Sequence, residues 1–146
     1  MDMNDIDYKV LKILYKKGGK AKVKYIQNEL NNYGYQEIRY STIDSCIERL
    51  NNKNLVIWEK YKPIELTAEG EEYAKEIMRH SQLLEVLLCE ELDMTPQQAH
   101  EETEKFNLLF SCDTINKICE KYNHPNKCPC GEKIHNSSSC YCQKDL

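Results

Sequence analysis

The chain has 146 residues, a formal net charge of −4 and 40% hydrophobic residues, and it contains few glycines and prolines. This composition argues against a disordered protein, and the length suits one small domain with an extension or two very small domains sharing a core. No stretch approaches 18 apolar residues, and the acidic first ten residues do not resemble a signal peptide. We therefore expect a cytoplasmic protein with no membrane partner, whose eight cysteines are thiols or metal ligands rather than disulfides.

Charge is distributed unevenly along the sequence. Residues 1–64 hold twelve Lys and Arg against eight Asp and Glu, whereas residues 65–123 hold five against fourteen. Only the first segment therefore suits a polyanion such as DNA. The last 23 residues are nearly neutral and contain four of the cysteines, so the counts alone divide the chain into three segments.

The first segment begins with two predicted helices. Apolar residues recur at helical spacing over residues 6–14, and Gly18-Gly19, which tolerates left-handed backbone angles, closes this helix. A second short helix is predicted over residues 23–30. A polar connection over residues 31–36 then leads to a third.

Ser41 is predicted to be the N-cap of the third helix, with Asp44 completing a pair that resembles a capping box. Ile43, Ile47 and Leu50 form the apolar face of this helix. The other positions are free to meet phosphates or base edges: Thr42, Ser45, Glu48, Arg49 and Asn52.

Two predicted strands, at residues 56–59 and 64–66, flank a basic tip at residues 60–63. Three helices followed by such a hairpin are the pattern of a winged helix-turn-helix, whose third helix enters the major groove of DNA. Cations available to neutralise phosphates are Arg39, Arg49, Lys60 and Lys62. The charges alone would also fit an ordinary solvated surface, so the order of the elements carries the DNA-binding prediction.

The acidic second segment predicts three further helices. A long helix starts at Ala68, a second begins after the N-cap Thr95 with Pro96 in its first position, and a third begins at Ser111. The expected fold is therefore mainly α, formally α+β: a winged helix, then an all-helical domain, then a short Cys-rich tail.

The sequence resembles the iron- and manganese-dependent repressors of the diphtheria-toxin-repressor and manganese-transport-regulator family. The stretch Ser41–Val56 resembles the family's recognition helix, and residues 55–62 with 66–70 resemble its wing and the start of the next helix. The resemblance implies a DNA-binding domain at 1–66, a dimerisation and metal-binding domain at 67–123 and a divergent tail at 124–146. It also implies that Ser41, Thr42 and Ser45 face DNA, and that a homodimer binds a palindromic operator about one helical turn apart.

A divalent metal site is also implied within the helical domain. His100 and Glu104 stand four residues apart and share one helical face, a spacing that more often reflects an ordinary surface pair than a ligand pair. The resemblance adds that Glu85, His100 and Glu104 coincide with family ligand positions, with His80 one place from another. We expect Fe²⁺ or Mn²⁺ here, while the donors would also suit Zn²⁺.

The departures from the family pattern indicate that its principal site has been lost. Asn107 and Leu108 stand where the family has Glu and His, and Lys9 and Lys12 fall on its ligand positions in the first helix. Leucine does not ligate, and an ammonium group repels a cation. Ser81 occupies the remaining histidine position.

The tail offers a second candidate site. It begins like the family's His-Pro…Cys-Pro-x-Gly motif and then places thiols at Cys128, Cys130, Cys140 and Cys142, with His124 nearby. Four thiolates can hold Zn²⁺ or an iron–sulfur cluster, and incidental thiols or a reversible disulfide are the alternatives.

No enzyme signature is complete: the deaminase-like His100-Glu101-Glu102 lacks its second cysteine, and no phosphate-binding glycine loop is present. We therefore expect a metal-responsive transcriptional regulator, a repressor of metal-homeostasis genes. The alternatives are a redox or iron–sulfur sensor that uses the tail, and a winged-helix protein-interaction module with structural zinc.

Overall fold

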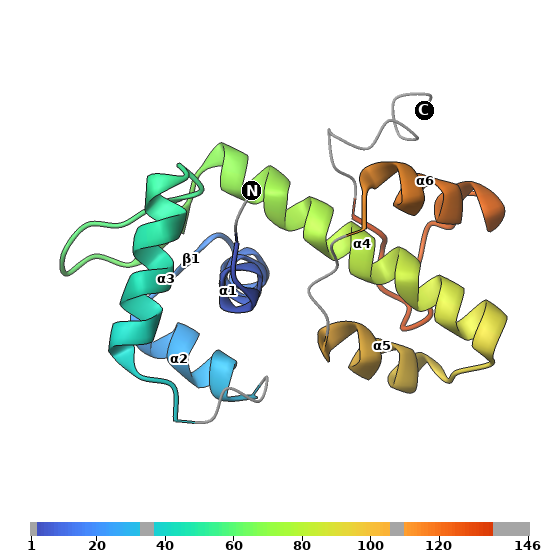
Figure 1. Ribbon diagram of the computed structural model, residues 1–146, viewed down its shortest axis with the longest axis horizontal. Helices are drawn as coiled ribbons and strands as arrows, with labels where there is room; N and C mark the ends of the chain where they lie inside the picture. The colour runs from blue at the N-terminus through green and yellow to red at the C-terminus, as the bar shows by residue number, and fades with distance from the viewer. Residues whose placement is uncertain (1–2, 33–36, 106–109, 136–146) are drawn as a thin grey trace. The chain divides into compact units, whose positions relative to one another are not determined.

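The computed structural model describes residues 3–32, 37–105 and 110–135. Within these ranges the chain forms six helices and three short strands, which divide into two compact units, Met1–Ala74 and Lys75–Leu146 (Figure 1). The fold is mainly helical, as predicted. Four positions used in the sequence analysis, Asn107, Leu108, Cys140 and Cys142, lie outside the described residues.

Helix α1 (Asp5–Lys16) agrees with the first predicted helix, and Leu11 and Leu14 on its apolar face are fully buried. Gly18 and Gly19 then adopt φ values of +89° and +95°. The Gly19 N–H donates to the Leu14 carbonyl at 2.7 Å. The glycine pair ends the helix as predicted, because residues without a Cβ adopt left-handed angles at little cost.

Helices α2 (Val23–Asn32) and α3 (Tyr40–Asn52) supply the rest of the first unit's helical core. Their predicted apolar faces are confirmed by complete burial of Ile26, Leu30, Ile43, Ile47 and Leu50. The exposed side of α3 therefore carries its polar residues.

The predicted N-cap at Ser41 is wrong. Helix α3 begins one residue earlier, with the extended backbone of Arg39 as its cap and no hydrogen bond from a capping side chain. Ser41 lies inside the first turn, where its carbonyl accepts a hydrogen bond from the Ser45 hydroxyl at 3.0 Å. The Ser41 side chain is thus exposed on the helix surface.

A three-stranded antiparallel sheet completes the first unit, with β3 (Ile64–Leu66) between β1 (Lys20–Ala21) and β2 (Val56–Ile57). In register, Lys20 lies opposite Glu65, and Val56 lies opposite Leu66. The sequence analysis missed β1, since two residues carry no alternating pattern.

The tip between β2 and β3 is longer than predicted, because the strand ends at Ile57 rather than at Glu59. The Lys62 N–H donates to the Glu59 carbonyl at 3.1 Å, and Tyr61, with φ of +66°, is 93% exposed. The Lys62 ammonium pairs with the Glu59 carboxylate at 2.7 Å on the surface. A short solvent-exposed turn therefore presents the basic residues.

A buried ion pair links α1 to α3. The Asp7 carboxylate has no exposed surface and accepts two hydrogen bonds from Arg49, Nη2 to Oδ1 at 2.8 Å and Nε to Oδ2 at 3.2 Å. Burial alone would raise the pKa of Asp7, but hydrogen bonds, led by that from Arg49, lower it overall. Arg49, which the sequence analysis expects at a DNA phosphate, thus directs two of its N–H groups to Asp7, while its side chain remains 34% exposed.

Helix α4 (Ala68–Leu92) belongs to both units, and α5 (Pro96–Lys105) and α6 (Cys112–Lys121) follow in the second. The predicted cap at Thr95 is confirmed, since the Gln98 N–H donates to its hydroxyl at 3.2 Å. Ser111, where the third helix was expected to begin, is the N-cap of α6, and its hydroxyl accepts a hydrogen bond from the Thr114 N–H at 3.2 Å. Among the described residues, no helix is long and apolar enough to span a bilayer.

The segment after α6 folds back as a tight turn. Lys127 and Lys133 form an antiparallel bridge, and the Cys128 N–H donates to the Glu132 carbonyl at 2.9 Å. Gly131, with φ of +92°, allows the reversal. We call residues 126–134 the tail turn; its Cys128 and Ile134 pack into the second unit's core with Leu83, Val86, Ile115 and Cys119. The described part of the expected tail thus belongs to this unit.

We predict that Arg49→Ala lowers the free energy of unfolding by about 2 kcal/mol, because it leaves the Asp7 carboxylate buried without its partner. Arg39→Ala, which removes an exposed arginine, is the matched control and should change stability by less than about 0.5 kcal/mol. The Asp7 contribution is present above about pH 4 and is lost as pH falls through its lower folded pKa. Urea unfolding at pH 7 measures the difference, and equal stabilities for the two variants would contradict it.

Candidate metal centre and nucleic-acid interface

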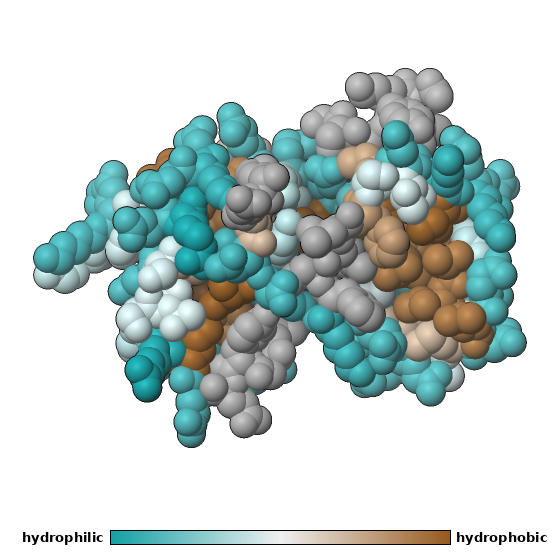
Figure 2. All heavy atoms as spheres, viewed as in Figure 1, coloured by the Kyte–Doolittle hydropathy of each residue, from teal (hydrophilic) through white to brown (hydrophobic). Residues whose placement is uncertain are grey.

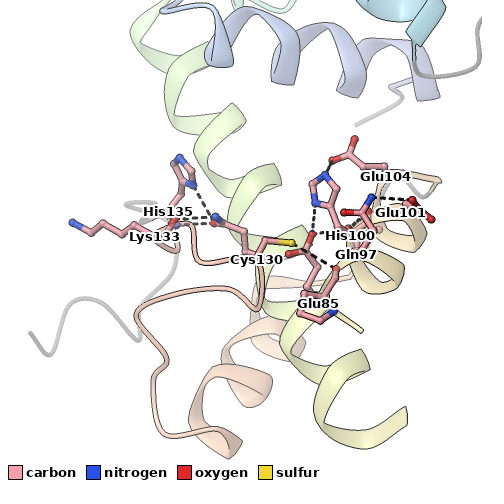
Figure 3. Close-up of polar contacts among 11 residues, drawn as sticks. Glu85, Gln97, His100, Glu101, Glu104, Cys130, Lys133 and His135 are labelled. Atoms are coloured by element: carbon pink, nitrogen blue, oxygen red, sulfur yellow. Dashed lines mark hydrogen bonds and ion pairs between the residues drawn. The ribbon is translucent and has the colours of Figure 1, made fainter. Parts of the chain in front are cut away.

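Helices α4 and α5 bring a buried carboxylate against an imidazole. Glu85 of α4 is 3% exposed, and its Oε1 lies 2.9 Å from His100 Nδ1 of α5 (Figure 3). The same oxygen accepts a hydrogen bond from the Thr103 hydroxyl at 3.0 Å. Thr103 was missed by the sequence analysis, although its position three residues after His100 places it on the same helical face. The Thr95 cap fixes where α5 starts and so which face meets Glu85.

The tail turn supplies a third donor at the same place. Cys130 lies at its tip, and its Sγ, His100 Nδ1 or Nε2 and a Glu85 oxygen all lie within 4.8 Å of one another. Figure 3 shows the sulfur beside the Glu85 carboxylate. The sequence analysis placed Cys130 in a four-thiol tail site. The structure instead brings it to the helical site.

Glu104 lies on the other side of His100. Its Oε1 is 3.9 Å from His100 Nε2, whereas Glu85 faces Nδ1 (Figure 3). The two carboxylates therefore face different ring nitrogens, and Glu104 is not part of the three-donor group. The His100 side chain is 40% exposed, so the group is open to solvent on one side.

His80 does not join Glu85. Five residues apart on a helix correspond to about 140° of rotation, so the two side chains leave α4 on different faces. His80 lies instead beside Glu76, with its Nε2 3.8 Å from the carboxylate, and beside Cys112 of α6. Burial lowers the pKa of His80, which favours the neutral imidazole.

The other expected tail ligands have different surroundings. Cys128 is buried in the apolar core, and this burial raises the pKa of its thiol although the backbone N–H groups of Cys130 and Glu132 donate to it. His124 Nδ1 lies 3.3 Å from Cys119 Sγ. Cys140 and Cys142 fall outside the described residues. The Glu85 charge contributes to raising the pKa of both Cys128 and Cys130, but of these two thiols the three-donor group includes Cys130.

The Glu85, His100 and Cys130 group has the electrostatics of a cation site. Burial and the neighbouring Glu85 charge raise the pKa of the Cys130 thiol. Burial and the Glu85 charge also raise the pKa of Cys89, one helical turn beyond Glu85. A divalent cation would reverse this effect, because it favours the thiolate. The donor set of one carboxylate, one imidazole and one thiol fits Zn²⁺ or Fe²⁺ better than Mn²⁺, which favours oxygen ligands.

The positions expected to meet DNA lie on the first unit. Its exposed side chains include Arg39, Ser41, Thr42, Ser45, Lys60 and Lys62. The Ser45 hydroxyl is bonded to the Ser41 carbonyl, and Lys62 is paired with Glu59. None of these side chains is held in the core, so each is sterically available to a ligand.

We predict that Cys130→Ser weakens Zn²⁺ binding at least tenfold. Loss of a residue that only supports a metal ligand already costs about tenfold or more in affinity, and loss of a ligand should cost no less. The double variant Cys140→Ser, Cys142→Ser is the matched control. If the four tail thiols formed the site, this double variant would lose as much Zn²⁺ affinity as Cys130→Ser. If Cys130 acts with Glu85 and His100, the double variant keeps its affinity. Anaerobic titration against a chromophoric zinc chelator measures both, and equal losses would contradict the three-donor site.

Comparisons with known proteins relate this chain to metal-dependent regulators. Residues 67–136 match the family described as the iron dependent repressor, metal binding and dimerisation domain. A search of curated proteins finds no match. Among solved structures, ScaR with bound Zn²⁺ has a TM-score of 0.72 and 25% identity over 88% of this chain and 58% of its own. The manganese regulator SloR has a TM-score of 0.69 and 26% identity over 92% and 60%.

The chain spans about 60% of the length of these two regulators. A hypothetical protein from Sulfolobus solfataricus is similar in fold over almost its whole length, with a TM-score of 0.70 and 22% identity over 90% of this chain and 97% of its own. Residues 67–136 thus match the metal binding and dimerisation domain of iron dependent repressors, and the chain is similar in fold to metal-dependent regulators.

Proposed function

We propose that this protein is a metal-responsive transcriptional repressor that binds DNA as a homodimer. The observation that carries the proposal is the group formed by Glu85, His100 and Cys130, since it lies in the part of the chain that matches a metal binding and dimerisation domain. Similarity to metal-dependent regulators supports the same reading.

The first unit is the proposed DNA reader, a winged helix-turn-helix. Helix α3 exposes Ser41, Thr42 and Ser45 for the major groove, and the β2–β3 tip carries Lys60 and Lys62 for the flanking phosphates. A hollow of about 470 Å³ in the same unit adds further cations, being lined by Lys17, Lys20, Lys22, Lys24, Tyr25, Asn28, Ala21 and Pro63. The excess of basic residues in positions 1–64 supplies the attraction to a polyanion.

The second unit is the proposed sensor. A bound cation would neutralise the buried Glu85 carboxylate and would be held jointly by α4, α5 and the tail turn. Glu85 anchors the group because Thr103 fixes its oxygen, and His100 is oriented by α5. Helix α4 begins in the first unit and continues into the second, so one continuous helix connects the proposed reader to the proposed sensor. The metal acts only to the extent that it binds the DNA-competent state better.

A homodimer is proposed through the second unit. Figure 2 shows hydrophobic residues gathered on its visible face over the C-terminal half of α4. In this half of the helix, Leu87 and Leu88 are half-buried and Leu92 is 64% exposed. Pairing two copies would cover this surface and present two α3 helices to one palindromic site. An iron–sulfur cluster on the tail is not part of the proposal, since Cys128 packs in the core while Cys130 joins Glu85.

The test is selection of duplexes from a random DNA library by the full chain with and without Zn²⁺ or Fe²⁺. We expect a palindrome whose half-sites are about one helical turn apart, bound more tightly with metal. His100→Ala should retain metal-free affinity and lose the metal response. Failure to enrich any sequence, or an unchanged response in His100→Ala, would contradict the proposal and favour a protein-interaction module.

Lys60→Ala and Lys62→Ala should each weaken binding to the selected duplex and to unrelated duplexes alike. Each should also reduce the slope of log affinity against log salt concentration by about one, since one phosphate contact is lost. Lys117→Ala, which removes an exposed lysine from α6, is the matched control. Fluorescence anisotropy at several salt concentrations measures the slopes. Equal slopes for all three variants would remove the β2–β3 tip from the DNA interface.

A further inference from the structure

A second group of possible metal ligands lies on the second unit, away from Glu85. Glu76 and His80 stand one helical turn apart on α4, and Cys112 is the first residue of α6. Cys112 Sγ lies 2.5 Å from Glu76 Oε1 and 3.8 Å from His80 Nε2, and the imidazole nitrogen lies 3.8 Å from the same carboxylate oxygen. The three donor atoms all lie within 4.8 Å of one another.

Local structure holds this arrangement in place. The Ser111 cap fixes the start of α6, so Cys112 occupies its first turn. Further along the helix, Ile115 and Cys119 pack into a core that Leu83 and Val86 of α4 share. Because α6 is anchored to α4 by this core, the thiol is placed against the Glu76 and His80 face by the packing of the whole unit.

The spacing of the donors matches metal coordination in part. Zn–S bonds of about 2.3 Å and Zn–N or Zn–O bonds of about 2.0 Å at a tetrahedral angle put sulfur about 3.5 Å from the other donor atom. Cys112 Sγ and His80 Nε2 are 3.8 Å apart and already fit this distance, whereas Cys112 Sγ and Glu76 Oε1 are 2.5 Å apart and would move about 1 Å further from each other when a cation binds between them. The His80 side chain is 8% exposed and the Glu76 side chain 24%, so the donors are largely shielded but not sealed from solvent.

We propose that Glu76, His80 and Cys112 form a second metal site, for a thiophilic divalent cation of the Zn²⁺ class. A thiolate with an imidazole and a carboxylate selects against Mg²⁺, Ca²⁺ and Mn²⁺, which favour oxygen ligands. The three protein donors leave one position of a tetrahedral ion for water. The cation would fasten the start of α6 to α4.

This site is distinct from the group at Glu85. His80 and Glu85 differ by five residues on α4, which is about 7.5 Å along the axis and 140° around it. One ion is therefore not held by both His80 and Glu85. None of the positions that the family resemblance implies as ligands belongs to the second group; these positions are Lys9, Lys12, Ser81, Glu85, His100, Glu104, Asn107 and Leu108, and His80 stands one place from Ser81. The proposal does not depend on DNA binding.

The test uses Co²⁺ as a spectroscopic substitute for Zn²⁺, added anaerobically to the full chain carrying Cys140→Ser and Cys142→Ser so that the last thiols contribute nothing. Cys112→Ser should lose one equivalent of bound Co²⁺ and its share of the near-ultraviolet sulfur-to-cobalt absorption. Cys130→Ser should lose a different equivalent, and combining the two should remove both. Cys119→Ser, a buried thiol on the same helix, is the matched control and should retain both.

If Cys112→Ser keeps the full Co²⁺ stoichiometry and absorption, the proposal is wrong and the group is only a hydrogen-bonded contact between α4 and α6. Far-ultraviolet circular dichroism checks that each variant folds. If Cys112→Ser does not fold, His80→Gln replaces it, with the same expected loss of one equivalent. Because the Cys130→Ser result is read separately, failure of the site at Glu85 and failure of this second site are distinguishable.

Discussion

The Glu85 carboxylate is the constraint on which the second unit depends. Glu85 is only 3% exposed, so its side-chain oxygens lose most of their contact with water, and the fold must replace that contact. Two of the replacements come from α5, through His100 and Thr103. The third neighbour, Cys130, carries no positive charge, so it does not offset the charge of a carboxylate. A buried acid with an imidazole and a thiol around it is a poor hydrophobic core and a good metal site.

Sulfur changes which cation such a site selects. In the proposed site, Cys130 would supply a soft sulfur ligand, which moves the preference toward Zn²⁺ and Fe²⁺. Lys9 and Lys12, which stand at ligand positions implied by the family resemblance, lie on α1 and are buried. The proposed DNA-reading unit has an exposed polar helix and a basic tip, and the proposed sensor has donors that differ from those the family resemblance implies.

What the sequence predicts well here is local. The Gly18-Gly19 stop, the cap at Thr95 and the helix start at Ser111 depend on a few neighbouring residues, and the structure agrees with all of them. Non-local features were missed: β1 is defined only by its pairing with β3, and Arg49 pairs with Asp7, 42 positions away, while its side chain stays 34% exposed. Cys130 was grouped with its sequence neighbours, whereas chain reversal brings it to His100. Such partners follow from packing, which no local pattern encodes.

The most direct measurement of the central claim is X-ray absorption at the zinc edge of the full chain loaded anaerobically with Zn²⁺. The account predicts an average of one sulfur at about 2.3 Å per zinc, with the remaining ligands nitrogen or oxygen at about 2.0 Å. The average is the same whether the cation sits with Cys130 or with Cys112. A shell of four sulfurs would contradict the account and return the sensor to the tail thiols.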